Sequence, residues 1–483
     1  MNRRTALGVI AGGAAALVAS RFAVLRSRAE TTSAITVPRF EVLLKIPPVL
    51  MPTKRTETQD EYYIVQSEVE QEILPGRLTR IWSYHGVFPG PTIRVRRGRT
   101  AVVHHTNLLP THTVVHLHGG RTPSDSDGFA TDMVMPGNTR TYTYPNQQRA
   151  ATLWYHDHAM DRTGENVYRG LAGFYIIEDD EELSLPLPKG DFDVPLVLQD
   201  RMFNADGSFL YDTFGHTGMQ GNVMLVNGVP WPRMEVSTRK YRFRILNGSN
   251  ARPFQLALSN GDPFTVIGTD GGLLPEPLAV KSLPLAMAER ADVVVDFSRI
   301  PVGTKVFLLN TREKSALQGL MRFDVAQREQ DDASVPPRLS DPGFLSRSAI
   351  TGGRTWTLQR GFSFREGVPP IVWTINGRRF GPDRSDAKIP LGEVQLWRFR
   401  NEAGRFFGQL HPAHVHLAHF QVLERNGKPP LAHESGWKDT VALESGEEVL
   451  VMIRFEQFRG RYMFHCHNLE HEDHAMMSRF DVV

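Results

Sequence analysis

The chain of 483 residues contains one cysteine, Cys466, so it cannot form an internal disulfide bond. It also lacks an excess of charge, because 55 basic residues face 53 acidic ones, which gives a formal net charge of +2. This balance provides no reason to expect a nucleic acid or a membrane surface as a partner. Long helical patterns are scarce, and the apolar run that ends at Ala19 is too short to span a bilayer comfortably.

The N-terminus has the pattern of an export leader. Arg3 and Arg4 precede a weakly apolar, Gly/Ala-rich run, and this arrangement predicts export of the folded protein by the twin-arginine machinery. We expect residues 1–29 to form the signal peptide, with cleavage after Ala29 leaving no stable membrane span. The mature protein would be periplasmic or extracellular. Without the five arginines of the leader, 50 basic residues face 53 acidic ones, a net charge of −3.

The remaining sequence favours an all-β fold of three β-sandwich domains. Short alternating apolar and polar stretches are separated by turn signals, and the chain contains 32 prolines and 41 glycines. Two polar, proline-containing breaks divide it. We predict domains over residues 38–178, 192–326 and 354–483, with a linker over residues 327–353.

A weak internal repeat supports three equivalent domains. Each one contains an asparagine at a corresponding place, Asn107, Asn247 and Asn401, followed by a strand that reads His116-Leu117-His118, Gln255-Leu256-Ala257 or His414-Val415-His416. The first and third copies contain histidines and the second does not. We therefore expect the active site between the outer domains, with the middle domain as a spacer.

Histidines are concentrated in a way that predicts metal binding. Ten of the 18 histidines fall in four clusters, each of which contains His-X-His. Side chains at positions i and i+2 of a strand point to the same face, so each pair can hold a metal from one side. The four clusters are His116/His118, His156/His158, His411/His414/His416 and His465/His467/His471.

Cys466 lies between two of these histidines, and Met476 follows five residues after His471. Thiolate, imidazole and a weak thioether are the ligands of a blue-copper electron-transfer site. Because strand side chains alternate, Cys466 should point away from His465 and His467. The cysteine would then bind one metal inside the third domain while its neighbours bind others at the domain interface, on the order of 10 Å away.

These four motifs together resemble the multicopper oxidases over nearly the whole mature chain. Segments 111–128, 144–149 and 154–160 resemble the bacterial spore-coat laccases and bilirubin oxidases, and segments 426–430, 436–440 and 471–473 also resemble the periplasmic cuprous oxidases. The resemblance implies three cupredoxin-like Greek-key domains and four copper ions. It assigns a type 1 copper to His411, Cys466, His471 and axial Met476, a type 2 copper to His116 and His414, and a type 3 pair to His118, His156, His158, His416, His465 and His467.

The resemblance also implies the reaction. One-electron oxidation of a donor at the type 1 site would be coupled to four-electron reduction of O2 to water at the other three coppers. Asp127 and Glu472 match acids that the family places near that cluster, and we predict that they relay protons. Asp157, between two ligands, is expected to be structural.

Two features favour phenolic or other aromatic donors, as in a laccase. The stretch from Arg354 to Pro390 contains no methionine, and Phe407-Gly408-Gln409-Leu410 replaces the acid and methionine that cuprous oxidases carry there. Asp439 and Asp473 remain, but two acids alone suit soft Cu(I) poorly. We expect His411 to be uncovered and open to bulky donors. Cuprous oxidase and bilirubin oxidase activities are the alternatives, whereas a copper-free scaffold protein or a nitrite reductase would lack part of the ligand set.

Overall fold

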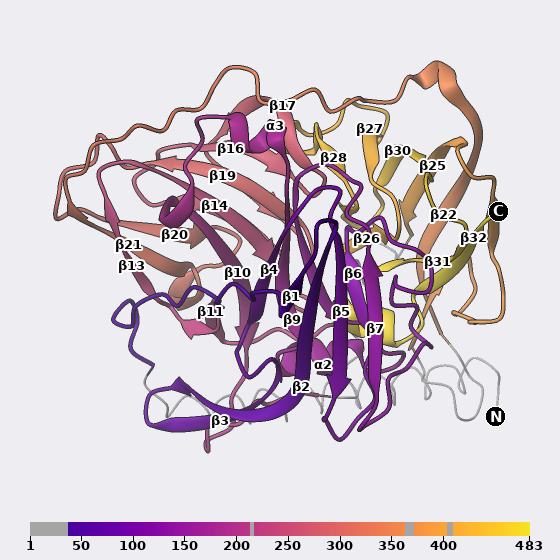
Figure 1. Cartoon of the computed structure of the whole chain (residues 1–483), viewed down its shortest axis with the longest axis horizontal. Helices are drawn as coiled ribbons and strands as arrows, with labels where there is room; N and C mark the ends of the chain where they lie inside the picture. The colour runs from indigo at the N-terminus through magenta and orange to yellow at the C-terminus, as the bar shows by residue number, and fades with distance from the viewer. Residues whose placement is uncertain (1–36, 213–216, 363–370, 403–408) are drawn as a thin grey trace, which may run out of the picture.

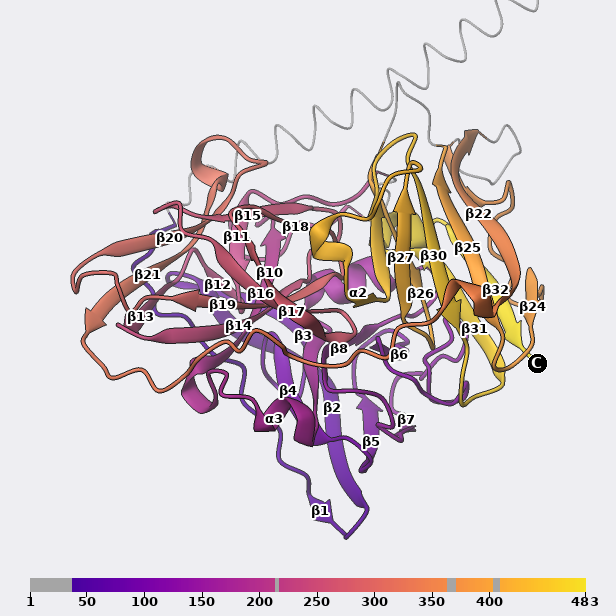
Figure 2. The same ribbon diagram turned by 90° about the horizontal axis from the view of Figure 1, so that it is seen from above.

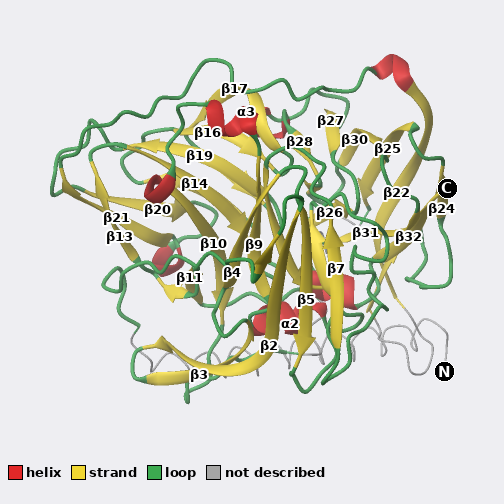
Figure 3. Ribbon diagram, in the orientation of Figure 1, coloured by secondary structure: helices red, strands yellow, loops and turns green. Residues whose placement is uncertain are grey.

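The computed structural model describes residues 37–212, 217–362, 371–402 and 409–483. The expected leader lies outside these residues, and so do Phe407 and Gly408. β-Strands dominate the described part (Figure 3). No helix within it has both the length and the apolar character needed to cross a membrane.

The first domain packs two sheets against each other. One sheet has the order β1-β2-β5-β7 with β3 beside β2, and the other has the order β4-β9-β8-β6. Its strands are β1 (Lys54–Arg55), β2 (Gln59–Leu74), β3 (Arg77–Tyr84), β4 (Gly90–Arg96), β5 (Thr100–Asn107), β6 (Val115–His118), β7 (Thr139–Tyr144), β8 (Ala151–Asp157) and β9 (Ala172–Glu178). Two short helices, α2 (Thr163–Arg169) and α3 (Asp180–Ser184), flank β9.

The second domain has sheets of order β12-β11-β10-β14-β19-β16-β17 and β13-β21-β20-β15-β18. Its elements are η1 (Gly190–Phe192), β10 (Asp193–Arg201), β11 (Val223–Val226), β12 (Val229–Pro230), β13 (Arg233–Ser237), β14 (Lys240–Asn247), β15 (Phe254–Leu258), β16 (Phe264–Thr269), β17 (Gly272–Val280), β18 (Leu283–Leu285), β19 (Arg290–Asp296), β20 (Lys305–Asn310), η2 (Ser315–Leu317) and β21 (Gly319–Gln327).

The third domain has sheets of order β23-β22-β25-β30-β27-β28 and β24-β32-β31-β26-β29. Its elements are η3 (Arg347–Ala349), β22 (Ile350–Phe362), β23 (Ile371–Ile375), β24 (Ala387–Ile389), β25 (Val394–Asn401), β26 (His411–Val415), β27 (Phe420–Arg425), η4 (Ala432–Glu434), β28 (Trp437–Lys438), β29 (Thr440–Leu443), β30 (Glu448–Arg454), β31 (Gly460–Cys466), α4 (Leu469–Asp473) and β32 (Met477–Val482).

The expected repeat is visible in the strand pairing. Each domain contains two parallel pairs at corresponding places, β2 with β5 and β4 with β9, then β10 with β14 and β13 with β21, then β22 with β25 and β24 with β32. The repeated asparagines also make equivalent contacts. The side-chain amide groups of Asn107, Asn247 and Asn401 each donate to two backbone carbonyls and so close the connection after the strand.

The segment predicted as a linker runs along the middle domain and differs at its end from the prediction. β22 begins at Ile350, so residues 350–353 are already strand. Leu339 is buried in the core of the second domain, and its backbone N–H donates to the carbonyl of Pro275. The segment is therefore partly packed against the middle domain instead of free.

The three domains meet around the histidine strands. In Figures 1 and 2 the strand β6 of the first domain, which pairs with β8, lies beside β26 of the third domain, which pairs with β31, while most of the middle domain occupies the other side of the molecule. The inner faces of the sandwiches form separate apolar cores, and Cys466 and Met476 belong to the core of the third domain.

Candidate metal centre

Neighbouring antiparallel strands present the histidines in facing pairs. In the first domain β6 and β8 place His116 opposite His156, and in the third domain β26 and β31 place His414 opposite His465. The second histidine of each motif lies two residues further and points to the same face. The strand geometry predicted from sequence is therefore present in both outer domains.

The two outer domains bring these faces together. The His116 ring stacks on the His416 ring with centroids 3.8 Å apart, and the His118 ring stacks on the His414 ring at 3.7 Å. All four rings are buried. The site is thus built across a domain interface, because each outer domain contributes half of it.

The ring nitrogens of eight histidines converge in three sets whose ligand atoms lie within 4.8 Å of one another. These sets are His116/His118/His414, His118/His156/His467 and His158/His416/His465. His118 belongs to two of them. The arrangement has the shape of three adjacent metal positions, and it divides the predicted type 3 ligands between two of those positions.

The set of His158, His416 and His465 indicates whether a cation fits between its ring nitrogens. The Nε2 atom of His465 lies 3.2 Å from the Nε2 atoms of both His158 and His416. The Nδ1 atom of His465 donates to the Cys466 carbonyl, and that of His416 donates to the Asp127 carboxylate. In these neutral tautomers the Nε2 lone pairs of His416 and His465 face each other and repel, so a shared metal ion fits the set.

The other two sets also contain ring nitrogens that are available to bind metal. Within the described part of the chain, the buried nitrogens His116 Nε2, His118 Nδ1, His156 Nε2, His414 Nε2 and both ring nitrogens of His467 have no hydrogen-bond partner. Buried polar atoms normally have a partner, and imidazole is a preferred ligand of copper. The unpaired nitrogens therefore fit metal ions.

A fourth set surrounds the cysteine. The Sγ atom of Cys466 lies 3.3 Å from Nδ1 of His411 and 3.7 Å from Nδ1 of His471, and these two nitrogens are 3.1 Å apart. The buried side chain of Met476 belongs to the same core, and its carbonyl accepts from the Cys466 backbone N–H. Cys466 points away from the three-metal sets, as the alternation of strand side chains predicts.

Two residues that the sequence did not single out support this sulfur-containing set. Asn468 donates its backbone N–H to Cys466 Sγ at 3.4 Å, and its side chain accepts from the backbone of His471 at the start of α4. Trp373 on β23 stacks on the His471 ring at 3.8 Å. A tryptophan among many aromatic core residues carries no sequence signal that would have marked it.

Burial keeps the imidazoles in the form that binds metal. It lowers the pKa of His411 to about 3 and that of His158 to about 4. Burial also raises the pKa of the Cys466 thiol, so its thiolate requires a cation nearby. Neutral imidazole and thiolate are the ligand forms that metals bind.

The two predicted relay acids both lie against histidines of the three-metal sets. The Oδ2 atom of Asp127 accepts from His416 Nδ1 at 2.7 Å, and Glu472 Oε1 lies 3.5 Å from His158 Nδ1. Burial raises the pKa of both carboxyl groups, and the neighbouring Asp473 raises that of Glu472 further. Asp157 accepts from the backbone N–H groups of Val114 and Ala159, in keeping with a structural role.

The prediction that His411 is uncovered is wrong. Both His411 and His471 are fully buried, because His411 lies on β26 inside the sandwich and His471 is covered by Trp373. His419 is also buried, and its Nε2 atom lies 3.7 Å from Oδ2 of Asp439 beside the three-metal sets.

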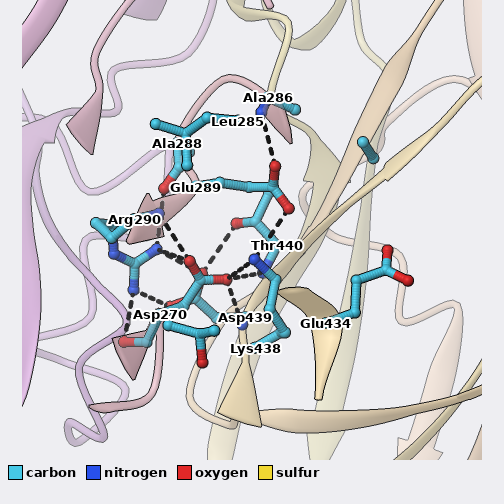
Figure 4. Close-up of polar contacts among 12 residues, drawn as sticks. Asp270, Leu285, Ala286, Ala288, Glu289, Arg290, Glu434, Lys438, Asp439 and Thr440 are labelled. Carbon is cyan, nitrogen blue, oxygen red and sulfur yellow. Dashed lines mark hydrogen bonds and ion pairs between the residues drawn. The ribbon is translucent and has the colours of Figure 1, made fainter. Parts of the chain in front are cut away.

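A buried charge network next to the three-metal sets was not found from sequence. Figure 4 shows Arg290 and Asp270 of the middle domain in contact with Asp439 and Lys438 of the third domain. Burial alone would raise the pKa of Asp439, but the Arg290 guanidinium outweighs it and holds that pKa below its usual value. The middle domain therefore reaches the site, although it contributes no histidine to it.

The fold and the sets of nitrogen and sulfur ligands define a protein of the copper-binding oxidase class. Three family models described as "Multicopper oxidase" match residues 67–182, 165–322 and 354–483. The chain is 36% identical to a laccase of Bacillus subtilis (strain 168), with 93% of this chain and 99% of that protein covered. It is 39% identical to a bilirubin oxidase of Albifimbria verrucaria, with 92% and 81% covered.

A solved structure shares this architecture. The crystal structure of a laccase from Pediococcus acidilactici Pa5930 matches with a TM-score of 0.86 and 33% identity, covering 93% of this chain and 95% of that one. The chain belongs to the multicopper oxidase family. The predicted architecture of three cupredoxin-like β domains is confirmed.

The protein is an oxidoreductase with oxygen as acceptor, and copper is its cofactor. When bound, copper supplies one-electron chemistry at the sulfur-containing set and a site of oxygen reduction at the histidine sets. The protein holds the imidazole ligands neutral, fixes the tautomers of several of them through hydrogen bonds, and excludes bulk water from the ligands by burial.

Proposed function

We propose that this multicopper oxidase is laccase-like and couples one-electron oxidation of phenolic or other aromatic donors to reduction of O2 to water. The observation that carries the proposal is the position of Cys466. Its Sγ atom belongs to the set with His411 and His471, while its chain neighbours His465 and His467 belong to the three-metal sets. One short stretch of covalent backbone therefore links an electron-accepting site to an oxygen-reducing one.

The same geometry supports a ligand assignment. We propose that His411, Cys466 and His471 hold the type 1 copper with Met476 as axial ligand, and that His116 and His414 hold the type 2 copper. The type 3 pair would be held by His118, His156 and His467 on one side and by His158, His416 and His465 on the other. Asp127 and Glu472, which face His416 and His158, are proposed as proton relays.

The contacts of the two remaining acids argue against cuprous oxidase activity. Asp439 is buried against Arg290, and both carboxylate oxygens of Asp473 accept backbone N–H groups from Thr163 and Gly164 at the start of α2. Acids engaged in this way are not free to bind an incoming ion. Soft Cu(I) also prefers thioether ligands, and residues 354–390 contain no methionine.

Oxygen uptake by the copper-loaded protein tests the donor class. We expect rapid uptake with a methoxyphenol and no added Cu(II), and no uptake by Cys466→Ser under the same conditions. Uptake that requires added Cu(II) would replace the laccase-like proposal with a cuprous oxidase. Bilirubin oxidase activity is the second alternative, which the 39% identity to a bilirubin oxidase supports, and bilirubin as donor in the same assay measures it.

We also propose that the protein is exported by the twin-arginine route to the periplasm or the cell exterior, as Arg3 and Arg4 suggest. Replacing both with lysine is expected to leave active enzyme inside the cell. Unchanged export of that variant would contradict the proposal.

A further inference from the structure

One histidine of the three-metal sets faces the opposite way from five of the others. His116, His156, His414, His416 and His465 each place Nδ1 against a backbone carbonyl or a carboxylate and direct Nε2 to the metal positions. His118 does the reverse. Its Nε2 donates to Asp439 Oδ1 at 3.0 Å, with Thr440 Oγ1 at 3.2 Å, and its unpaired Nδ1 is left for metal.

Asp439 is in turn held by the middle domain. Arg290 Nη1 donates to Asp439 Oδ1 at 2.8 Å, and Nη2 contacts Oδ2, so the guanidinium grips both carboxylate oxygens (Figure 4). A bidentate pair of this kind fixes the orientation of both partners. Oδ1 of Asp439 is the same atom that accepts from His118, so its orientation passes directly to that ring.

Arg290 connects all three domains. Its Nε donates to the Thr152 carbonyl on β8, the strand that carries His156, at 2.9 Å. Its Nη1 donates to the Ala288 carbonyl and its Nη2 to the Asp270 carbonyl, both within the middle domain. Together with the contacts to Asp439, these bonds occupy every guanidinium nitrogen, and the side chain is fully buried.

The residues next to Arg290 and Asp439 leave space for this pair and hold its segment in place. A Cβ atom at Gly119, the residue after His118, would lie 2.7 Å from Asp439 Oδ2 and 2.8 Å from Arg290 Nη2, closer than real Cβ atoms come. On the other side, Lys438 Nζ bridges Asp270 Oδ2 and Glu289 Oε1 of the middle domain at 3.0 and 2.9 Å. The segment that carries Asp439 is therefore anchored before and at the acid.

We propose that Arg290 of the ligand-free middle domain is a positioning residue for the copper cluster, because it orients Asp439 and thereby fixes the tautomer and ring position of His118. His118 is proposed as a type 3 ligand, and its ring also lies in the set of His116 and His414, so its displacement disturbs a type 3 position directly and the adjacent type 2 position through that contact. The inference rests on the proposed ligand role of His118. It gives the middle domain a function beyond that of a spacer.

The test compares Arg290→Lys with a matched control, Arg242→Lys, in copper-loaded full-length protein. Lysine retains the charge but cannot grip two carboxylate oxygens. Arg242 is a buried arginine of the same domain that pairs with Glu182 and Asp292, away from Asp439. The readouts are copper retained during dialysis against a chelator, the type 2 signal in the EPR spectrum and the blue type 1 absorption.

For Arg290→Lys we expect about 10- to 100-fold weaker retention of type 2 copper and a changed type 2 EPR signal, the range typical of residues that support metal ligands. The type 1 absorption should persist, and Arg242→Lys should behave as the wild type. An unchanged type 2 signal in Arg290→Lys would overturn the proposal. So would an equal loss in the control, because it would indicate general loosening of the middle domain.

A double mutant tests whether Arg290 acts through the acid. Asp439→Asn alone should lose type 2 copper, and adding Arg290→Lys to it should cause little further loss, since coupled residues are not additive. Fully additive losses would overturn the proposed route. If wild-type protein itself retained no type 2 copper, the ligand assignment would fail instead, so the two failures are distinguishable.

Discussion

The Nδ1 atom of His416 in the third domain lies 2.7 Å from Oδ2 of Asp127 in the first domain. The backbone carbonyl of the same aspartate accepts from His116 Nδ1 at 2.5 Å. Asp127 therefore holds one imidazole from each outer domain, and these two rings stack on each other. A single buried residue aligns the two halves of the copper cluster.

Replacing Asp127 with asparagine should slow oxygen reduction more than electron entry. The amide keeps the shape of the side chain but lacks the carboxylate charge and its ability to carry a proton, so we expect about a 10- to 100-fold loss in the rate of reoxidation. Stopped-flow bleaching and reoxidation of the type 1 absorption measure the two steps separately. Asp125→Asn, at an exposed neighbour, is the control, and equal slowing of both steps would contradict the prediction.

Cys466→Ser should abolish the blue colour and nearly all oxidase activity while the fold survives. A hydroxyl oxygen cannot replace the thiolate as a ligand of the type 1 copper, but its volume is close to that of the thiol, so the core should tolerate it. Visible absorption, oxygen uptake and circular dichroism check the three parts of this prediction. A blue Cys466→Ser protein would rule out the assignment of the sulfur ligand.

Removal of copper should destabilise the protein. Metal ions bind the native chain in preference to the unfolded one, and without them the Nε2 lone pairs of His416 and His465 face each other unshielded. We expect a lower melting temperature for chelated protein and its recovery when copper is returned. Calorimetry of the loaded, stripped and reloaded protein measures this, and identical melting of loaded and stripped protein would contradict it.

His105 should make stability depend on pH, although it is not a ligand. Burial lowers its pKa to about 3, and its ring packs among Tyr84, Tyr142 and Tyr155. In the unfolded state His105 has a pKa near 6.5 and binds more protons than in the folded state. Its contribution to stability is therefore present above about pH 6.5 and is lost as the pH falls below that value. Between pH 7 and 5 this loss is about 2 kcal/mol.

His105→Gln removes that titration and should therefore show a smaller loss of unfolding free energy over the same pH range. His104→Gln, at the adjacent position on the opposite face of β5, is the control and should lose as much stability as the wild type. Urea unfolding of copper-free protein at the two pH values gives the comparison. Parallel losses in wild type and His105→Gln would show that His105 does not contribute.

Much of the site could be predicted because its information is local. Two histidines separated by one residue in a strand share a face, and a cysteine between two histidines must point to the other face, whatever the rest of the chain does. Four such motifs in two of three repeats were enough to predict that the outer domains meet. The facing of His116 and His156, and of His414 and His465, agrees with that argument.

Other parts could not be predicted because they depend on contacts between distant segments. The prediction that His411 is exposed rests on its flanking residues alone, but the sandwich around β26 buries it. Arg290 and Asp439 are 149 residues apart and belong to different domains, and neither lies in one of the four histidine clusters. Nothing in the pair His116-Leu117-His118 distinguishes the ring that presents Nδ1 from the ring that presents Nε2.

The amino-acid sequence by itself determined which side chains are available for metal, the face of the strand on which each one lies, and the all-β class, because strand alternation and ligand chemistry act over a few residues. The tertiary structure alone decided which histidines share a metal position, how each ring is protonated and oriented, and how the middle domain supports them. For His416 and His118 those properties arise from hydrogen bonds across domain interfaces, with Asp127 and Asp439 as partners 289 and 321 residues away in the chain.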